Sequence, residues 1–180
     1  MPLAFKASLG LSLLDLMITV AVLAVLLHLA VPAFSSLITE QRRLAFANEL
    51  ASGLRAARME AVHRNRTVIV QPLGGDWAQG WQMVVDESGR GIEDPTNPVI
   101  LSRTGPWPIT VKPTANLETQ VGFDYLGTPR LANRGALAGS FYLCEPGAEA
   151  HRRVVIARSG RVRVTRSAAP TPLCPATPTS

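Results

Sequence analysis

Apolar residues are concentrated near the beginning of the chain, in a run that starts after Gly10 and ends at Phe34. The run contains one carboxylate, Asp15, and no Lys or Arg. About 20 helical residues cross the hydrocarbon core of a bilayer. Residues 11–34 are therefore predicted to form the transmembrane part of a long N-terminal helix.

The order of the first two segments differs from that of an ordinary secretory signal. In a secretory signal, the apolar segment precedes a small-residue cleavage site and is removed with it. Here a short segment with one positive charge, Lys6, ends in the small residue Gly10 before the apolar run begins. Cleavage after Gly10 would remove residues 1–10 as a leader peptide and keep the membrane helix in the mature protein.

A second helical pattern follows the apolar run. Between residues 35 and 65, apolar side chains recur at steps of three and four residues, which marks one face of an amphipathic helix. These side chains are Leu44, Ala47, Ala51, Leu54, Ala57 and Ala61. Their small size favours close packing of this helix on a β-sheet.

From residue 66 to residue 166 the pattern changes to short β segments separated by turn residues. Strands are predicted at residues 67–71, 81–86, 99–102, 109–112, 120–123, 140–144, 152–157 and 161–165. Hairpin turns are predicted at residues 87–91 and 158–160. Residues 167–180 form a Pro-rich tail. The predicted fold class is α+β, with a long N-terminal α-helix packed on a C-terminal antiparallel β-sheet head.

Charge changes the interpretation of the last part of the chain. The formal net charge is +5. From His151 onward there is no Asp or Glu, but there are six arginines: Arg152, Arg153, Arg158, Arg161, Arg163 and Arg166. Such clustering indicates an anionic partner such as nucleic acid or lipid headgroups. The alternative is a genome-wide preference for arginine, because the chain has only two lysines, Lys6 and Lys112.

Three of these arginines lie on a predicted hairpin. Strand alternation places Arg161 and Arg163 on one face and Val162 and Val164 on the other. With the valines facing the core, the two guanidinium groups would project into solvent, with Arg158 at the turn. Guanidinium groups on a rigid hairpin can bind successive phosphates bidentately. The alternative is a solvated strand face that binds nothing.

The two cysteines, Cys144 and Cys174, are predicted to form a disulfide. Export behind a membrane segment would bring them into an oxidising periplasm. The bond would close a loop of roughly 30 residues and contribute about 3–4 kcal/mol in the chain-entropy model. It would also hold the tail against the domain. The alternative, a catalytic thiol, has no convincing histidine partner.

Asp15 is an unusual residue for a membrane segment. A carboxylate is costly there and is a functional candidate by default. Cleavage after Gly10 would free an amine on Leu11, which is close enough to pair with this carboxylate on a packed neighbour. The alternative is that Asp15 only marks the membrane interface.

The segment from Gly10 to Leu16, Gly-Leu-Ser-Leu-Leu-Asp-Leu, resembles the signal sequence of type IV prepilins, usually Gly-Phe-Thr-Leu-Ile-Glu-Leu. The resemblance implies that a prepilin peptidase cleaves between Gly10 and Leu11 and N-methylates Leu11. It also gives Asp15 the role of the family's glutamate, which guides subunit docking into the filament. Leu11 replaces the usual Phe, and Asp15 is one methylene shorter than Glu.

The second half resembles the GspH/FimT branch of the pilin superfamily. The matching residues are Trp77, Gly80-Trp81, Asp86, the segment Phe123-Asp124-Tyr125-Leu126-Gly127, and Gly160-Arg161-Val162-Arg163, which is similar to the Gly-Arg-x-Arg motif of FimT-like minor pilins. The resemblance implies a type IV pilin-like fold with a single pass through the bacterial inner membrane and a periplasmic C-terminal domain. It further implies assembly with other pilins or pseudopilins into a pilus or pseudopilus.

Two functions follow from this resemblance. The first is a minor type IV pilin in which Arg158, Gly160, Arg161 and Arg163 bind double-stranded DNA, without sequence preference, for natural transformation. The alternative is the H-type pseudopilin of a type II secretion system, a structural filament subunit. No catalytic residues, metal ligands or cofactors are predicted, because the sequence offers no nucleophile with a base and no histidine with a partner at ligand spacing.

Overall fold

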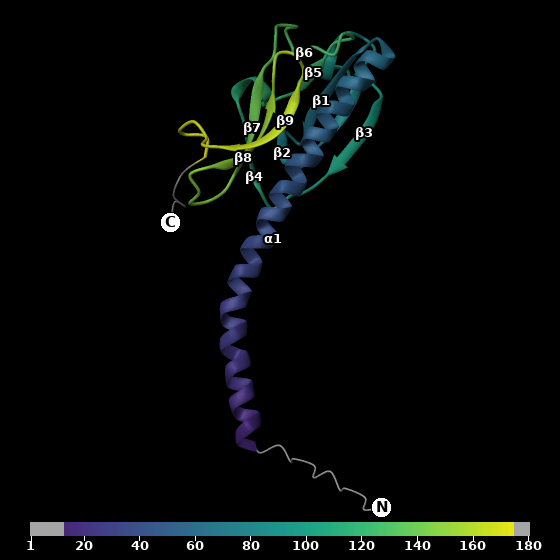
Figure 1. Ribbon diagram of the computed structural model, residues 1–180. Helices are drawn as coiled ribbons and strands as arrows, with labels where there is room; N and C mark the ends of the chain where they lie inside the picture. The colour runs from purple at the N-terminus through teal and green to yellow at the C-terminus, as the bar shows by residue number, and fades with distance from the viewer. Residues whose placement is uncertain (1–12, 175–180) are drawn as a thin grey trace, which may run out of the picture. The chain divides into compact units, whose positions relative to one another are not determined.

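The computed structural model describes residues 13–174 (Figure 1). The chain divides into two compact units, with the boundary in the sequence between Gln41 and Arg42. The helix α1 (Leu13–Arg64) contributes residues to both units. The residues predicted for cleavage and methylation, Gly10 and Leu11, lie outside the described residues.

In the first unit, α1 exposes most of its large apolar side chains, among them Leu13, Leu16, Leu23 and Leu27. The predicted helical conformation is present from Leu13 onward. Within the described residues, however, no helix has both the length and the apolar character needed to cross a membrane. The transmembrane prediction for residues 11–34 is therefore not confirmed.

The second unit, here called the head, contains α1 from Arg42 onward. The predicted apolar face is confirmed, because its five residues from Ala47 to Ala61 are fully buried, as are Phe46 and Leu50. The helix ends close to the predicted position. Asn65 adopts the left-handed conformation at φ +52°, and the N–H groups of Asn65 and Arg66 donate to the carbonyls of Val62 and Ala61. These two bonds form a Schellman motif, which satisfies the last carbonyls of the helix.

The strands of the head form two antiparallel sheets. Sheet A has the order β3-β2-β1-β5-β6 and comprises β1 (Thr67–Leu73), β2 (Asp76–Asp86), β3 (Val99–Thr104), β5 (Val121–Phe123) and β6 (Pro129–Arg130). Sheet B has the order β4-β7-β8-β9 and comprises β4 (Thr110–Pro113), β7 (Gly139–Cys144), β8 (His151–Ile156) and β9 (Val162–Ser167).

Each predicted strand is present, but the head differs from the prediction in three ways. It contains two sheets, and the segment that connects them between β3 and β4 carries Pro106 and Pro108, which cannot donate ladder hydrogen bonds. Trp107 between them packs against Phe46 of α1, with ring centroids 5.4 Å apart. The connection expected as a tight turn at residues 87–91 runs on to β3 and contains the 3-10 helix η1 (Gly91–Glu93). The two-residue strand β6 was not predicted.

The core lies between α1 and the two sheets. Trp77 of β2 contacts Phe141 of β7 at 4.7 Å between ring centroids, which joins sheet A to sheet B. Its indole N–H donates to the carbonyl of Leu117 in the short helix η2 (Ala115–Leu117). Trp81 lies directly under α1, where a Cβ atom on Gly53 would overlap its ring. Glycine at residue 53 therefore allows the helix to approach the sheet closely.

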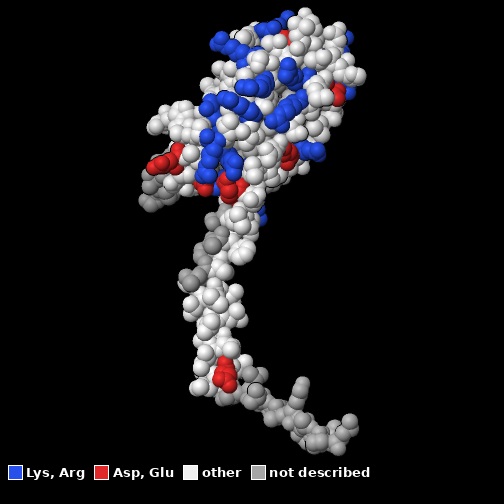
Figure 2. Space-filling model, viewed as in Figure 1, with Lys and Arg blue, Asp and Glu red and all other residues white. Residues whose placement is uncertain are grey.

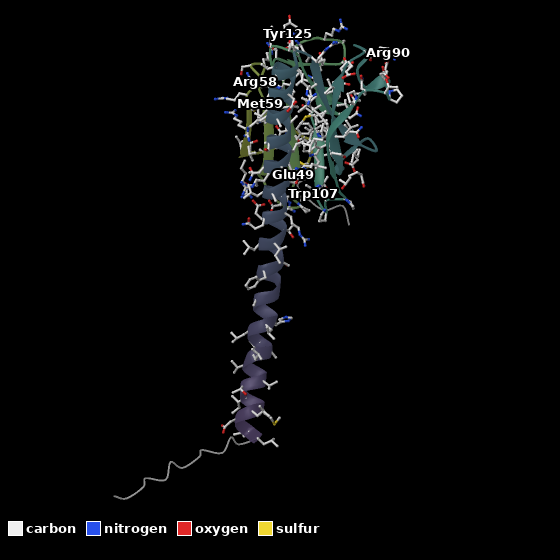
Figure 3. The ribbon with its side chains drawn as sticks, turned by 90° about the vertical axis from the view of Figure 1, so that its right-hand side faces the viewer. Glu49, Arg58, Met59, Arg90, Trp107 and Tyr125 are labelled. Atoms are coloured by element: carbon white, nitrogen blue, oxygen red, sulfur yellow. A yellow bond between two sulfur atoms is a disulfide. The ribbon has the colours of Figure 1, made fainter. Side chains whose placement is uncertain are left out.

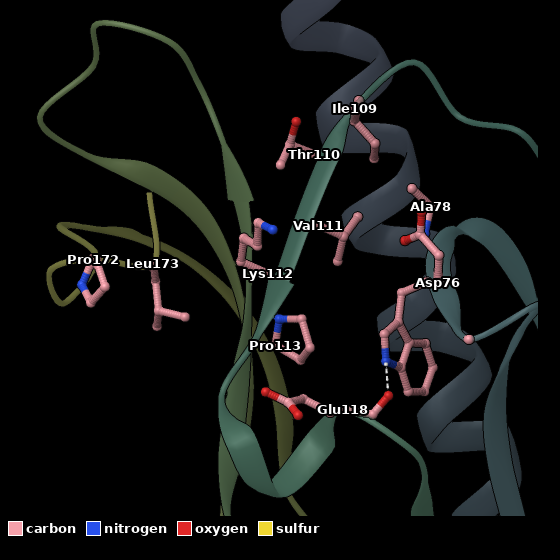
Figure 4. Close-up of a pocket in the computed structure, with 12 residues that line it drawn as sticks. Asp76, Ala78, Ile109, Thr110, Val111, Lys112, Pro113, Glu118, Pro172 and Leu173 are labelled. Carbon is pink, nitrogen blue, oxygen red and sulfur yellow. Dashed lines mark hydrogen bonds between the residues drawn. The ribbon is translucent and has the colours of Figure 1, made fainter. Parts of the chain in front are cut away.

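The predicted disulfide between Cys144 and Cys174 is present, with the two Cα atoms 5.4 Å apart. It attaches the tail to the end of β7. The neighbouring Pro172 and Leu173 form part of the wall of a pocket of about 670 Å³, opposite Asp76 and Ala78 and beside β4 (Figure 4). Trp77 also lines this pocket, and its indole N–H donates to the carbonyl of Glu118 at 3.3 Å.

Candidate nucleic-acid interface

The hairpin formed by β8 and β9, here called the basic hairpin, is closed by a tight turn at residues 157–161. The N–H of Gly160 donates to the carbonyl of Ala157 at 2.8 Å, and the N–H of Ala157 donates to the carbonyl of Arg161 at 3.0 Å. Gly160 has φ +78°, a conformation that side chains other than glycine rarely adopt. The predicted hairpin turn is confirmed.

The two faces of the basic hairpin also match the prediction. Val162 is buried opposite Ile156, and Val164 packs against the core opposite Val154. Arg161 and Arg163 point to the other side and are exposed, as is Arg158 in the turn. The fold thus presents three guanidinium groups together on one rigid element.

The arginines of the C-terminal cluster differ in what they contact. Within residues 13–174, the side chains of Arg158, Arg161 and Arg163 form no hydrogen bond or ion pair. By contrast, Arg153 donates to the hydroxyl of Ser140 at 2.9 Å, and Arg166 lies 3.5 Å from a carboxylate oxygen of Glu145. Figure 2 shows a band of basic side chains across the face of the head that is turned to the viewer.

Two arginines of α1, which the sequence analysis did not assign to this site, contact the hairpin region. Arg55 donates to the carbonyl of Val162 at 3.0 Å. This bond protects the edge of sheet B, because β9 is the last strand of that sheet. The side chain of Arg55 remains largely exposed and adds a positive charge beside the hairpin. The spacing of Arg55 and Arg58 is three residues, which places them on the same helix face.

Arg58 joins the hairpin turn to a second turn, at residues 124–128 between β5 and β6. Its Nε donates to the carbonyl of Gly127 at 3.0 Å. A Cβ atom on Gly160 would lie 2.5 Å from that carbonyl oxygen and 2.9 Å from the Arg58 Nε. Gly160 is therefore required by close packing as well as by its backbone conformation, and its contact with DNA stays a prediction.

The turn at residues 124–128 is held by Asp124. Its carboxylate accepts hydrogen bonds from the N–H groups of Leu126 and Thr128, both at 2.9 Å, and from Arg130 at 2.8 Å. Partial burial of the carboxyl opposes its ionisation, but these hydrogen bonds outweigh burial and lower the pKa of Asp124. The turn is therefore fixed by an ionised carboxylate at neutral pH.

Comparison with known proteins places this fold in a family. Residues 47–160 match the family model of the type II transport protein GspH. The chain is also 31% identical over 160 residues to the Pilin-like protein PilA1 of Thermus thermophilus, a match that covers 86% of this chain and 97% of that protein. The chain belongs to the GspH family of type IV pilin-like proteins.

The solved structures that resemble this GspH-family protein agree with the assignment. Two crystal structures of the type IV minor pilin FimU of Pseudomonas aeruginosa (strain PAO1) match with TM-scores of 0.56 and 0.54, at 25% and 27% identity. The matches cover 70% and 68% of this chain, and 90% and 91% of the two FimU chains. The resemblance to the GspH/FimT branch is confirmed.

The family match does not extend to every residue with a predicted role. The family match ends at Gly160, so Arg161 and Arg163 lie beyond it. Asp15 is exposed in the first turn of α1, and its role in assembly stays a prediction. Among the described residues, no group of three or more His, Cys, Asp or Glu side chains is arranged to hold a metal ion.

Proposed function

We propose that this GspH-family protein is a minor type IV pilin whose basic hairpin binds DNA without sequence preference, as in uptake for natural transformation. A prepilin peptidase removes residues 1–10 and N-methylates Leu11. Residues 11–34 anchor the chain in the inner membrane, the head lies in the periplasm, and Asp15 guides docking into the filament. The family assignment, the exposed apolar side chains of α1 and the prepilin-like segment at Gly10 support this proposal.

The observation that carries DNA binding is the basic hairpin itself. Arg158, Arg161 and Arg163 lie on one hairpin, are exposed, and have no carboxylate partner among the described residues. Three such groups can neutralise phosphates, and phosphate contacts bind nucleic acid without reading its sequence. Recognition of base edges would need an element that fits a groove.

The second candidate is the H-type pseudopilin of a type II secretion system. The matched family model, which describes a type II transport protein, favours it. In that function the arginines of the basic hairpin would be a solvated filament surface. The two candidates differ in whether wild-type protein binds duplex DNA.

Processing and assembly can be tested together in a bacterium that makes the full chain. Mass spectrometry of the membrane-extracted protein should find N-methylated Leu11 as the first residue. Asp15→Ala should still be cleaved but should incorporate poorly into sheared filaments, whereas Asp15→Glu, the matched control that keeps the carboxylate, should incorporate like wild type. A different first residue would refute the processing step. Normal incorporation of Asp15→Ala would mean that Asp15 only marks the membrane interface.

DNA binding can be tested with the purified full-length protein and a duplex of arbitrary sequence. The logarithm of the binding constant should fall linearly with the logarithm of the salt concentration, with a slope of about −3 for three neutralised phosphates. Binding should not depend on the base sequence. If wild-type protein shows no binding at low salt, the H-type pseudopilin becomes the better interpretation.

A further inference from the structure

The turn at residues 124–128 repeats the backbone hydrogen bonds of the basic hairpin turn. The N–H of Gly127 donates to the carbonyl of Asp124 at 2.8 Å, and the N–H of Asp124 donates to the carbonyl of Thr128 at 3.0 Å, the same two distances as at residues 157–161. Gly127 has φ +74°, close to the φ of Gly160. Each turn therefore presents two central residues in the same way, Arg158 and Ser159 in one and Tyr125 and Leu126 in the other.

The two turns are neighbours in space. The backbone of Gly160 packs directly against the carbonyl of Gly127, and Arg58 contacts both glycines. The tips of the turns consequently lie close together, one carrying a guanidinium group and the other an aromatic ring. In Figure 3, Tyr125 lies at the same end of the head as Arg58 and Met59, away from Glu49 and Trp107.

The residues around the second turn form an exposed apolar surface. Tyr125 is 54% exposed and Leu126 is 65% exposed, and Met59 and Val62 of α1 are exposed as well. A Cβ atom on Gly127 would contact the side chain of Val62 at 3.2 Å, so the turn and the helix end form one continuous patch. Large contiguous apolar patches that are rimmed by polar residues mark interaction sites or ligand-binding grooves. The hydrogen bonds of Asp124 hold the backbone of this patch before any ligand binds.

We propose that Tyr125, supported by Leu126, is a stacking platform for the bases of single-stranded DNA beside the basic hairpin. The proposal rests on the DNA-binding function proposed above and extends it to a second substrate class. Proteins that bind single strands combine positive charge along the backbone with aromatic side chains on which bases stack. In a duplex the base faces are covered by their neighbours, so the platform contributes only to the binding of single strands.

The surroundings of Tyr125 fit a base on its ring better than a phosphate. Tyr125 also borders a groove of about 1050 Å³ beside β1 and β5. The groove is lined by carboxylates of Asp86, Glu87 and Glu93 as well as by arginines, and these arginines include Arg130, which is paired with Asp124. The lining as a whole contains four carboxylates and four arginines, so it carries no formal net charge and attracts a phosphate less than the basic hairpin does, whereas a neutral base can enter.

The test compares two single strands that carry the same phosphates. Full-length protein is titrated with an oligothymidine of about 12 nucleotides, a length within the usual site size, and with an abasic strand of equal length. Wild type should bind the oligothymidine about tenfold more tightly than the abasic strand, in the range of one stacked base. Tyr125→Phe, which keeps the ring, should retain this preference. Tyr125→Leu should lose it. All three proteins should bind a duplex equally.

The outcomes separate this proposal from the one on which it rests. Binding of the duplex by wild type, together with equal affinity for the two single strands, overturns the stacking platform and leaves duplex binding intact. A preference for bases that survives in Tyr125→Leu overturns the assignment of Tyr125. If Tyr125→Leu keeps its base preference but incorporates poorly into filaments, the patch contacts a neighbouring pilin instead. Absence of any binding by wild type means that the DNA-binding function itself fails.

Discussion

Arginines occur in two regions of the head that differ in what surrounds them. In the basic hairpin, the side chains of Arg158, Arg161 and Arg163 are exposed and have no hydrogen-bond or ion-pair partner within residues 13–174. Around the connection between β2 and β3, the arginines are engaged. Arg90 forms an ion pair with Asp94 at 2.6 Å, and Arg134 lies 3.5 Å from the carbonyl of Gly89.

This difference shows that the number of arginines does not determine how much charge is available to a ligand. A guanidinium group that is paired with a carboxylate has part of its charge neutralised, so it attracts a phosphate less strongly than an unpaired group does. The hairpin arginines have no carboxylate partner among the described residues. The following four predictions test whether the two regions differ in the guanidinium groups that are free to bind a phosphate, rather than in net charge, and how the hairpin turn presents those groups.

The largest effect is expected when the hairpin arginines are removed. Arg161→Gln combined with Arg163→Gln should weaken duplex binding by about a hundredfold, or about 2.8 kcal/mol, if each contact contributes roughly tenfold. The salt slope should become less steep by about two. Titrations of full-length protein at several salt concentrations measure both quantities.

The matched control removes the same charge from the other region. Arg90→Gln combined with Arg134→Gln should leave affinity and salt slope close to wild type. If both double variants weaken binding equally, net charge decides the affinity and the two regions do not differ.

The next largest effect concerns the turn that presents the arginines. Gly160→Ala should destabilise the protein by about 2 kcal/mol, because alanine is strained at positive φ and its Cβ would meet the carbonyl of Gly127 at 2.5 Å. Gly147→Ala is the matched control, since Gly147 has φ +74° and no atom within 4 Å of a Cβ. It should cost only about 1 kcal/mol for the strained backbone. Denaturant unfolding compares the two, and equal costs would show that the contact with Gly127 does not matter.

The parts of the structure that could be predicted from the sequence are those with local signals. Strand alternation predicted which side chains of residues 161–164 face the core, and the repeat from Ala47 to Ala61 predicted the buried helix face. The two cysteines predicted their bond because they are the only pair. Processing at Gly10 and the role of Asp15 stay predictions, since Gly10 lies outside the described residues and the docking proposed for Asp15 would take place only in a filament.

The parts that could not be predicted depend on contacts between distant residues. Arg55 bonds to a carbonyl 107 residues away, and Arg58 to one 69 residues away. No local pattern links the turns at Gly127 and Gly160, although their glycines are in contact. The division into two sheets likewise depends on the path of the chain around Trp107, and β6 is too short to show alternation.

A third prediction changes a hairpin arginine from free to paired without removing it. Val155 lies directly opposite Arg163 in the pairing of β8 with β9. Val155→Glu should place a carboxylate next to that guanidinium and weaken duplex binding by about tenfold, roughly 1.4 kcal/mol. Val155→Gln has nearly the same shape without the charge and should bind close to wild type. Equal binding by the two variants would mean that Arg163 does not contact the phosphates.

The smallest effect is expected from the reverse change, which frees an arginine in the β2–β3 connection. Asp94 is bound by the hydroxyl and N–H of Thr96 and by Arg90. Hydrogen bonds from Thr96, then from Ser88 and Arg90, hold the pKa of Asp94 well below its usual range. Since its folded pKa is depressed, Asp94 stabilises the protein above the ordinary carboxyl pKa of about 4, and this contribution is lost as the pH falls through the folded value. Asp94→Asn should therefore lower the thermal midpoint most at pH 7, and the difference from wild type should shrink below about pH 4.

Asp94→Asn should also bind duplex DNA about twofold more tightly at low salt, because Arg90 is released while its surface charge remains screened. A difference in thermal midpoint that stays constant down to the lowest pH would show that the charge of Asp94 is not what stabilises the connection, and an unchanged affinity would show that releasing an arginine in this region does not make its charge available to DNA.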